Sequence, residues 1–544
     1  MRNLEKNKTS FLLGGFSQSA VLTTLSRISG YIRDVFIATF LGAGIFSDIF
    51  FISFKLPNLF RRITAEGALT SSFLPIYSKL RSQNSDFVAI KYFKKIIYKV
   101  TLILILLMIF FQISMPIVVS FIAPGFTDNS EVTNQIIFLT RITMIFMPLI
   151  SAVALLGVAT NVSGRFWILS FTPIILNSFI ILGCLSISDY WTIKSLPLGI
   201  AMVIGGIFQL IFMIVMIKNY KILNFKKIKK QVGTKNDKSV INFHIKQTWQ
   251  RFFPAAFGGG ILQINLLVDT ILASLLGFGA VSYLYFADRI TQLPLGIIGV
   301  ALSTSLLTSL SRASAQNDIK QFSKELTISF KIGLFFSIPA AFVFIFYNDL
   351  LIKVLFERGE FTFNETKQTS VALFAYSLGI PAFIMMKSCQ PAFLATGNTK
   401  TPMYIGFILL ILNIILSFIL MSLLNHAGIA LATSIVSWIG TTIYIIILVK
   451  NGKITKPKIS LKEEDSNLFV VIFYALKITL VSILMIIGMK LFQYTLEIFN
   501  LNETLILIIL CVIGIFVYLS ISLIFKYIPQ ELYDFIYSKF KKAK

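Results

Sequence analysis

The sequence predicts an all-α polytopic membrane protein with about fourteen transmembrane helices. Of its 544 residues, 56% are hydrophobic and only 13% are charged. Apolar runs long enough to cross a bilayer recur along the whole chain and are separated by polar segments. The lysines are concentrated in these segments, so we interpret the net charge of +25 as a sign of membrane topology. No nucleic-acid partner is expected.

Hydropathy and loop charge together predict the path of the chain through the membrane. The expected span centres lie at about residues 27, 57, 107, 145, 177, 205, 262, 297, 337, 382, 412, 437, 480 and 512. Lysines fill the segment Lys218 to Lys246, whereas Asp128 and Glu131 follow the third span without a base. Lys and Arg are retained on the cytoplasmic side, and the span count is even. Both termini are therefore expected in the cytoplasm, with no removable signal peptide.

A gapless internal repeat divides the chain into two halves. The segment RDVFIATFLGAGIFSDIFF from Arg33 matches VDTILASLLGFGAVSYLYF from Val268, which pairs Asp34 with Asp269. Further on, Asn177 pairs with Asn413. An even number of spans separates the copies, so the repeats are parallel, and a substrate path is expected between two lobes of about six helices each. The last two spans have no counterpart.

These features give the expected domain organisation. The segments are an N-lobe at 1–217, a basic cytoplasmic linker at 218–246, a C-lobe at 247–450, a cytoplasmic loop at 451–466, a helix pair at 467–526 and a basic cytoplasmic tail at 527–544.

Arginines inside apolar spans predict a central cationic cavity. A cation at the centre of a membrane helix costs about 2.5 to 17 kcal/mol, so these side chains are expected to face protein or water. Arg27, Arg33, Arg61 and Arg289 lie on the spans that begin each lobe. A planar guanidinium binds oxyanions through two hydrogen bonds, which suits a pyrophosphate or a carboxylate.

Structural alternatives remain open for the same residues. Arg27 lies seven positions before Asp34, on nearly the same helix face, and could pair with it. Arg61 and its neighbour Arg62 could extend to the lipid headgroups. Arg289 could pair with Asp288 or with a carboxylate on another span.

Enzyme chemistry and bound cofactors are not expected. Cys184, Cys389 and Cys511 are far apart and show no metal-ligand spacing. The sequence contains neither a P-loop nor a GxGxxG motif, so energy is expected from Na⁺, from H⁺ or from the membrane potential. Asp269, Asn413 and Thr433 offer oxygen ligands for a possible cation site, although a hydrogen-bonded polar cluster between helices would use the same residues.

Several motifs resemble those of the MurJ (MviN) family of lipid II flippases, within the multidrug/oligosaccharidyl-lipid/polysaccharide exporter (MOP) superfamily. They are FKLPNLFRRITAEGALTSSFLPIY from Phe54, YFADRITQLPLGIIGVAL from Tyr285, FERGEFT from Phe356 and the block from Tyr376 to Pro402. The resemblance implies a bacterial inner-membrane protein of cell wall biogenesis and cell shape. Such a protein moves the undecaprenyl-pyrophosphate-linked peptidoglycan precursor to the periplasmic leaflet by alternating access.

The resemblance also implies roles for individual residues. It places cavity arginines at Arg27, Arg33, Arg61 and Arg289 and a cavity acid at Asp48. The remaining charged candidates, for gating or structure, are Asp34, Arg62, Glu66 and Asp288. This chain has Thr396 and Asn398 where the family commonly has Arg and Asp, which puts a salt bridge between the lobes at that point in doubt. The implied partners are the lipid-linked precursor, membrane lipids and the cell-wall synthesis machinery, and a monomer is expected.

Two other functions stay open on the sequence. A related exporter of another lipid-linked oligosaccharide or of drugs would share the architecture, but an exporter of cationic drugs is expected to carry acids in its cavity. A glycosyltransferase or polymerase acting on the same lipid would need a catalytic acid or base at an aqueous face. Consumption of the lipid by the purified protein would distinguish this enzyme from a transporter.

Overall fold

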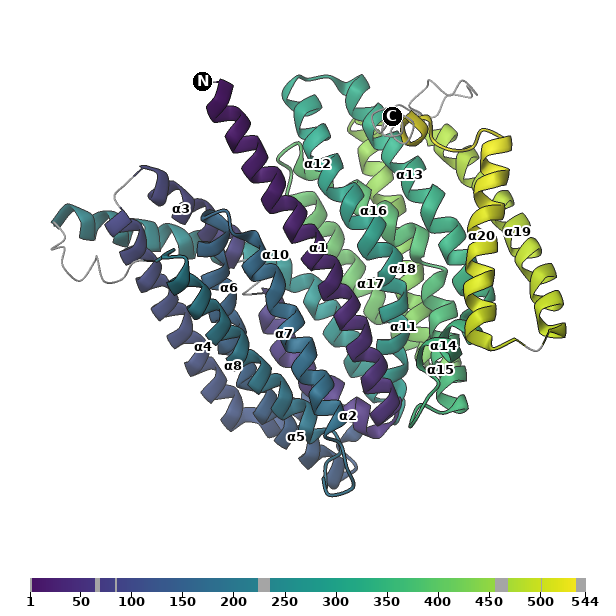
Figure 1. Cartoon of the computed structure of the whole chain (residues 1–544), viewed down its shortest axis with the longest axis horizontal. Helices are drawn as coiled ribbons and strands as arrows, with labels where there is room; N and C mark the ends of the chain where they lie inside the picture. Colours follow the sequence, from purple (N-terminus) through teal and green to yellow (C-terminus); the bar gives the residue numbers. More distant parts are fainter. Residues whose placement is uncertain are drawn as a thin grey trace. The chain divides into compact units, whose positions relative to one another are not determined.

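The computed structural model describes residues 2–63, 69–83, 86–223, 235–454, 468–499 and 501–534, and within these ranges the chain is helical, with short loops and no strand (Figure 1). Packing divides it into two units. Unit 1 comprises Met1–Ser282 with Arg358–Phe361, and unit 2 comprises Tyr283–Glu357 with Thr362–Lys544. The prediction of an all-α membrane fold is confirmed.

Unit 1 contains the N-terminal helices. They are α1 (Arg2–Leu41), α2 (Ile45–Phe60), α3 (Leu69–Gln83), α4 (Asp86–Ile122), η2 (Pro124–Phe126), α5 (Ser130–Met144), α6 (Phe146–Val162), α7 (Phe166–Leu185), α8 (Leu196–Asn219), α10 (Lys235–Ser274) and the start of α11 (Ala280–Pro294). α1 packs along α7, and α2 packs on α5 (Figure 1).

α10 joins two segments that the sequence analysis separates. It begins at Lys235, inside the expected linker 218–246, and its packing on α3 and α4 places it in unit 1 and not with the C-lobe helices. A hydrogen bond between the hydroxyls of Tyr92 and Thr248, 2.5 Å apart, joins α4 to α10. Tyr92 is fully buried and stacks on Phe73 of α3. The C-terminal part of the segment expected as a linker, from Lys235, is therefore the start of α10.

Unit 2 contains the rest of α11 and the C-terminal helices. They are η3 (Leu295–Gly299), α12 (Val300–Ala315), α13 (Ile319–Phe346), α14 (Asn348–Phe356), α15 (Phe363–Ser377), α16 (Ile380–Leu394), α17 (Lys400–Leu424), α18 (His426–Lys450), α19 (Leu468–Ile498) and α20 (Glu503–Ile524).

The C-terminal helix pair packs against one side of unit 2. α19 lies beside α20 (Figure 1). It also packs on α13. The buried Tyr518 hydroxyl of α20 donates a hydrogen bond to the Phe335 carbonyl of α13, at 2.6 Å. Lys353 of α14 forms an ion pair with Glu503 at the start of α20, at 2.5 Å. Polar contacts therefore hold this pair as well as apolar packing.

The described residues contain ten helices long and apolar enough to cross a membrane, or eleven if α15 and α16, bent by 44°, form one span. The exact count of fourteen is not confirmed. The remaining three expected centres fall on α1, α2 and α10. Polar and charged residues lower the hydropathy of α1, and α2 has 16 residues. Among the described side chains of α10, Gln263–Ser274 forms a shorter apolar stretch. These three helices also carry many of the predicted charged site residues.

Candidate functional site

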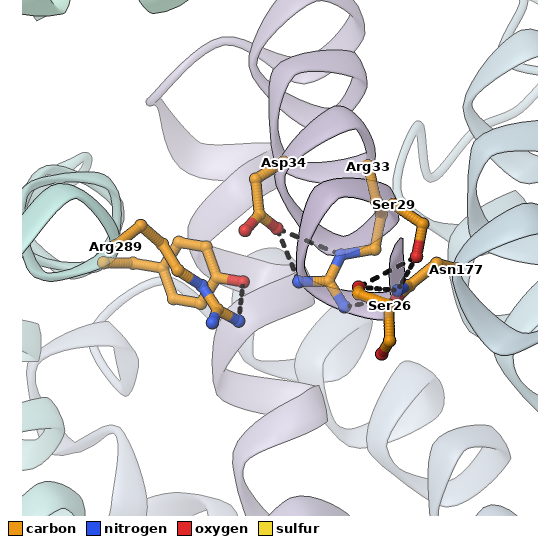
Figure 2. Close-up of polar contacts among 7 residues, drawn as sticks. Ser26, Ser29, Arg33, Asp34, Asn177 and Arg289 are labelled. Carbon is orange, nitrogen blue, oxygen red and sulfur yellow. Dashed lines mark hydrogen bonds and ion pairs between the residues drawn. The ribbon is translucent and has the colours of Figure 1, made fainter. Parts of the chain in front are cut away.

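An ion pair inside unit 1 joins neighbouring residues of α1. The Arg33 Nη2 and Nε atoms donate to Asp34 Oδ1 at 2.6 and 3.0 Å (Figure 2). Arg33 is 8% exposed and Asp34 is 2% exposed. The alternative pairing of Asp34 with Arg27 is not found, because Arg27 is exposed and Asp34 pairs with Arg33. The positive charge of Arg33 is therefore balanced within the protein.

Asn177 of α7 completes this cluster, and the sequence analysis gave it no site role. Arg33 Nη1 donates to Asn177 Oδ1 at 3.1 Å. The Asn177 Nδ2 atom donates to Ser29 Oγ at 2.8 Å and to the Ser26 carbonyl at 3.4 Å (Figure 2). The pairing of Asn177 with Asn413 in the internal repeat was the signal that could have identified it. Through these bonds the cluster connects α1 to α7.

Asp48 of α2 is predicted as a cavity acid. Its side chain is fully buried next to the N-terminus of α11. Its carboxylate accepts hydrogen bonds from the backbone N–H groups of Gly279 and Ser282, at 2.5 and 2.8 Å, and from Ser282 Oγ at 2.5 Å. An anion at a helix N-terminus satisfies N–H groups that lack partners within the helix. The geometry favours a helix-capping role for Asp48 over contact with a substrate.

The other predicted residues at α2 lie near its C-terminal end. Arg61 is half-buried, and its Nε atom donates to Asn58 Oδ1 at 2.9 Å. Arg62 is also half-buried. Glu66 lies outside the described residues.

Arg289 lies on the part of α11 that belongs to unit 2. Its Nη2 atom donates to the Tyr285 hydroxyl at 2.8 Å, and its guanidinium lies over the Tyr285 ring, 4.9 Å from the ring centre. The neighbouring Asp288 accepts a hydrogen bond from Gln292 at 3.1 Å. The structure thus places an aromatic hydroxyl beside Arg289, a contact that the sequence analysis did not predict.

The candidate cation ligands are divided between the units. Within unit 2, Thr433 Oγ1 donates to Asn413 Oδ1 at 3.4 Å, and Asn413 is 1% exposed. Asp269 is half-buried on α10 in unit 1. Among the described side chains, no cluster of three or more His, Cys, Asp or Glu residues could hold a metal.

The two departures from the family pattern make local contacts. Asn398 Oδ1 accepts from the Thr401 backbone N–H at 3.1 Å, and Thr396 Oγ1 donates to the Phe393 carbonyl at 2.9 Å. Both residues therefore stabilise the turn from α16 into α17.

A short segment within the FERGEFT motif belongs to unit 1, although the helices before and after it belong to unit 2. The Glu360 backbone N–H donates to the Thr39 carbonyl of α1 at 2.9 Å. Gly359 has a φ of 59°, and a Cβ atom there would overlap the Thr39 carbonyl oxygen. Glycine at 359 is required both by the left-handed backbone and by the close approach.

We expect Gly359→Ala to lower the thermal stability of the purified protein more than Gly397→Ala does. Both glycines have positive φ, but a Cβ atom at Gly397 would meet no atom within 4 Å. The two variants share a strain of about 1 kcal/mol from the backbone, and Gly359→Ala adds the steric overlap. Equal melting temperatures would contradict this reading of the contact with Thr39.

Comparison with known proteins identifies the family. The sequence profile described as "Lipid II flippase MurJ" matches residues 37–530. The chain belongs to the MurJ lipid II flippase family. It is 38% identical over 419 residues to the probable lipid II flippase MurJ of Rickettsia prowazekii (strain Madrid E), covering 77% of this chain and 80% of the relative. It is 33% identical to that of Rhizobium meliloti (strain 1021), covering 81% of each.

Solved structures agree with this assignment. The chain is similar to a lipid II flippase MurJ in an inward closed conformation, with a TM-score of 0.75, 31% identity, and coverage of 93% of this chain and 98% of that one. It also shares its fold with an inward-facing MATE family transporter of the MOP superfamily, at a TM-score of 0.62 and 10% identity, over 80% of this chain and 97% of that one. The predicted MurJ family is confirmed, and the protein is a multi-pass membrane protein.

Proposed function

We propose that this protein is a lipid II flippase, which moves undecaprenyl-pyrophosphate-linked peptidoglycan precursor from the cytoplasmic to the periplasmic leaflet of the bacterial inner membrane. The observation that carries the proposal is the match of the MurJ family profile to residues 37–530. Similarity to an inward-facing transporter supports alternating access as the mechanism. Lipid II would be relocated without covalent change, so this is transport and not catalysis.

The test is a leaflet-resolved assay of the precursor in cells depleted of this protein. We expect precursor to accumulate in the cytoplasmic leaflet and to return to the periplasmic leaflet when the full-length chain is expressed again. Unchanged distribution on depletion, with the protein absent, would refute the function. Accumulation of a different lipid-linked oligosaccharide would favour the related exporter.

The substrate chemistry follows from the arginines. We propose that Arg27 and Arg61, within unit 1, bind the pyrophosphate, since a guanidinium contacts a phosphate oxyanion through two hydrogen bonds. Arg289, within unit 2, is proposed for the same role on the same chemical ground. Arg27 is exposed and Arg61 is half-buried, so both are accessible within unit 1. Arg33 differs from them because Asp34 already neutralises its charge.

We also propose that Asn413 and Thr433, within unit 2, and Asp269, within unit 1, act in coupling transport to a cation. The contact between Thr433 and Asn413, and the carboxylate of Asp269 on an otherwise apolar stretch of α10, support the proposal. Oxygen atoms of this kind suit Na⁺ or a proton at membrane depth.

Asp269→Asn is expected to lower translocation and to weaken its dependence on Na⁺ or on pH, because the substitution removes the negative charge and keeps the shape. The measurement is translocation across a range of sodium concentrations and pH values, with protein abundance as the control. Wild-type translocation under all these conditions would show that the carboxylate is structural.

Orientation in the membrane is part of the same proposal, with both termini in the cytoplasm. With the native cysteines replaced, Asp128→Cys is expected to react with an impermeant thiol reagent added outside intact cells, and Gln316→Cys is expected to be protected. Both positions are exposed, so burial does not explain a difference. Labelling of position 316 from outside would overturn the orientation predicted from the loop lysines.

A further inference from the structure

Lys387, in the bent span formed by α15 and α16, differs from the other half-buried lysines described in unit 2. Each of the others lies against a compensating group. Lys353 forms the ion pair with α20, and three lie over aromatic rings, namely Lys331, Lys453 and Lys477. Lys387 makes no hydrogen bond, ion pair or ring contact with any described residue. Because an uncompensated cation inside a span is costly, its position indicates an anionic partner from outside the protein.

The side chain of Lys387 lies against the π-helical turn η3 (Leu295–Gly299). A Cβ atom added at Gly299 would lie 3.4 Å from Lys387 Cγ, so the aliphatic stem of the lysine packs on this glycine. α16 also packs on η3 and on α12. Because π-helical turns within α-helices are frequent at functional sites, η3 favours a functional role for the lysine beside it.

The first half of the internal repeat has a π-helical turn in the matching region. Residues 61–63 form it, shortly before the segment ALTSSFL from Ala68, which matches ALSTSLL from Ala301 directly after η3. The turn in unit 1 contains Arg61 and Arg62, whereas Leu295–Gly299 contains no charged residue. Lys387 of α16 supplies the positive charge beside the turn in unit 2. Each unit therefore has a cation at this turn, although different helices provide it.

The type of cation indicates the type of anion. A guanidinium contacts two oxygens of a phosphate together, whereas an ammonium on a flexible stem acts as a compact point charge. The peptidoglycan precursor carries a peptide as well as a pyrophosphate, and a peptide ends in a carboxylate. We propose that Lys387 binds a carboxylate of this peptide and is a specificity-determining residue for transport. This inference rests on the proposed function as a lipid II flippase.

The experiment measures the affinity of the purified full-length protein for two probes, lipid II with free peptide carboxylates and lipid II with these carboxylates converted to amides. Lys387→Met removes the charge and keeps a long side chain. It is expected to weaken binding of the free acid roughly 10- to 150-fold and to leave binding of the amide nearly unchanged. Lys387→Arg keeps the charge and is expected to bind the free acid more tightly than Lys387→Met does.

Lys477→Met is the matched control, because it removes a half-buried lysine of the same unit that already lies over aromatic rings. It is expected to change the affinity for neither probe. Equal affinity of the wild type and Lys387→Met for the free acid would overturn the proposal. An equal loss for both probes would also overturn it, since the lysine would then act on the pyrophosphate or on the fold.

The wild type provides a test that does not depend on the stability of a variant. It must bind the amide more weakly than the free acid, and equal binding of the two probes would refute the role of Lys387 even if Lys387→Met cannot be recovered. A wild type that binds neither probe would instead contradict the proposed function itself.

Discussion

Replacing Arg27 or Arg289 by alanine is expected to remove most lipid-precursor translocation while the protein stays at normal abundance in the membrane. Each substitution deletes a charge that we assign to the pyrophosphate. A hydrogen bond to a charged group contributes about 1.5 to 3 kcal/mol, which corresponds to a loss of roughly 10- to 150-fold in affinity. Arg27 is exposed, and Arg289 makes a polar contact with Tyr285 one turn away on the same helix.

Lysine at either position is expected to restore translocation only in part. It keeps the positive charge, but it loses the planar arrangement of donors that contacts two oxygens of a phosphate together. The measurement is translocation relative to membrane abundance for each variant. Full translocation by both alanine variants would show that these arginines do not bind the substrate.

Arg33→Ala is the matched contrast to Arg27→Ala and Arg289→Ala, because it is expected to change membrane abundance. It leaves the buried carboxylate of Asp34 without its counter-charge, and breaking such a pair costs about 3 to 5 kcal/mol. We therefore expect this variant to lose abundance, and Asp34→Ala to restore part of it when combined with Arg33→Ala. Combining Arg27→Ala with Asp34→Ala should not raise the membrane abundance above that of Asp34→Ala alone, because Arg27 is not the partner of Asp34.

Asp48→Ala is expected to prevent stable folding. The fully buried carboxylate accepts hydrogen bonds from two backbone N–H groups and one hydroxyl at the start of α11. Each buried donor left without a partner costs about 1 to 3 kcal/mol, so the total approaches the whole stability of a typical domain. Membrane abundance and the melting temperature of any recovered protein provide the measurement.

Two controls distinguish lost capping from lost charge. Asp128→Ala removes the same charge from an exposed loop and is expected to change neither abundance nor melting temperature. Ser282→Ala should destabilise the wild type but cost much less beside Asp48→Ala, because the hydroxyl then has no acceptor to lose. Normal abundance of Asp48→Ala would return Asp48 to the list of cavity residues.

The sequence by itself determined the membrane class, the positions of most helices, the internal repeat and the family. These properties depend on local composition and on motifs, since a long apolar run must cross the membrane as a helix wherever it lies. The first two helices, α1 and α2, show the limit of this reasoning, because α1 carries charged residues inside its apolar stretch and α2 has only 16 residues. Some of their polar residues have partners far away in the sequence, as Arg33 has Asn177 and Asp48 has Ser282.

Only the tertiary structure decided the partners of the charged residues. Asp34 pairs with Arg33 and not with Arg27. The long arginine side chain lets the Arg33 guanidinium contact the neighbouring carboxylate, while its Nη1 atom donates a hydrogen bond to Asn177 of another helix. Asp48 caps α11 by accepting a hydrogen bond from the backbone N–H of Gly279, which lies 231 positions later in the sequence. Helical periodicity gives the face on which a side chain lies, whereas the atoms opposite that face are set by how the helices pack.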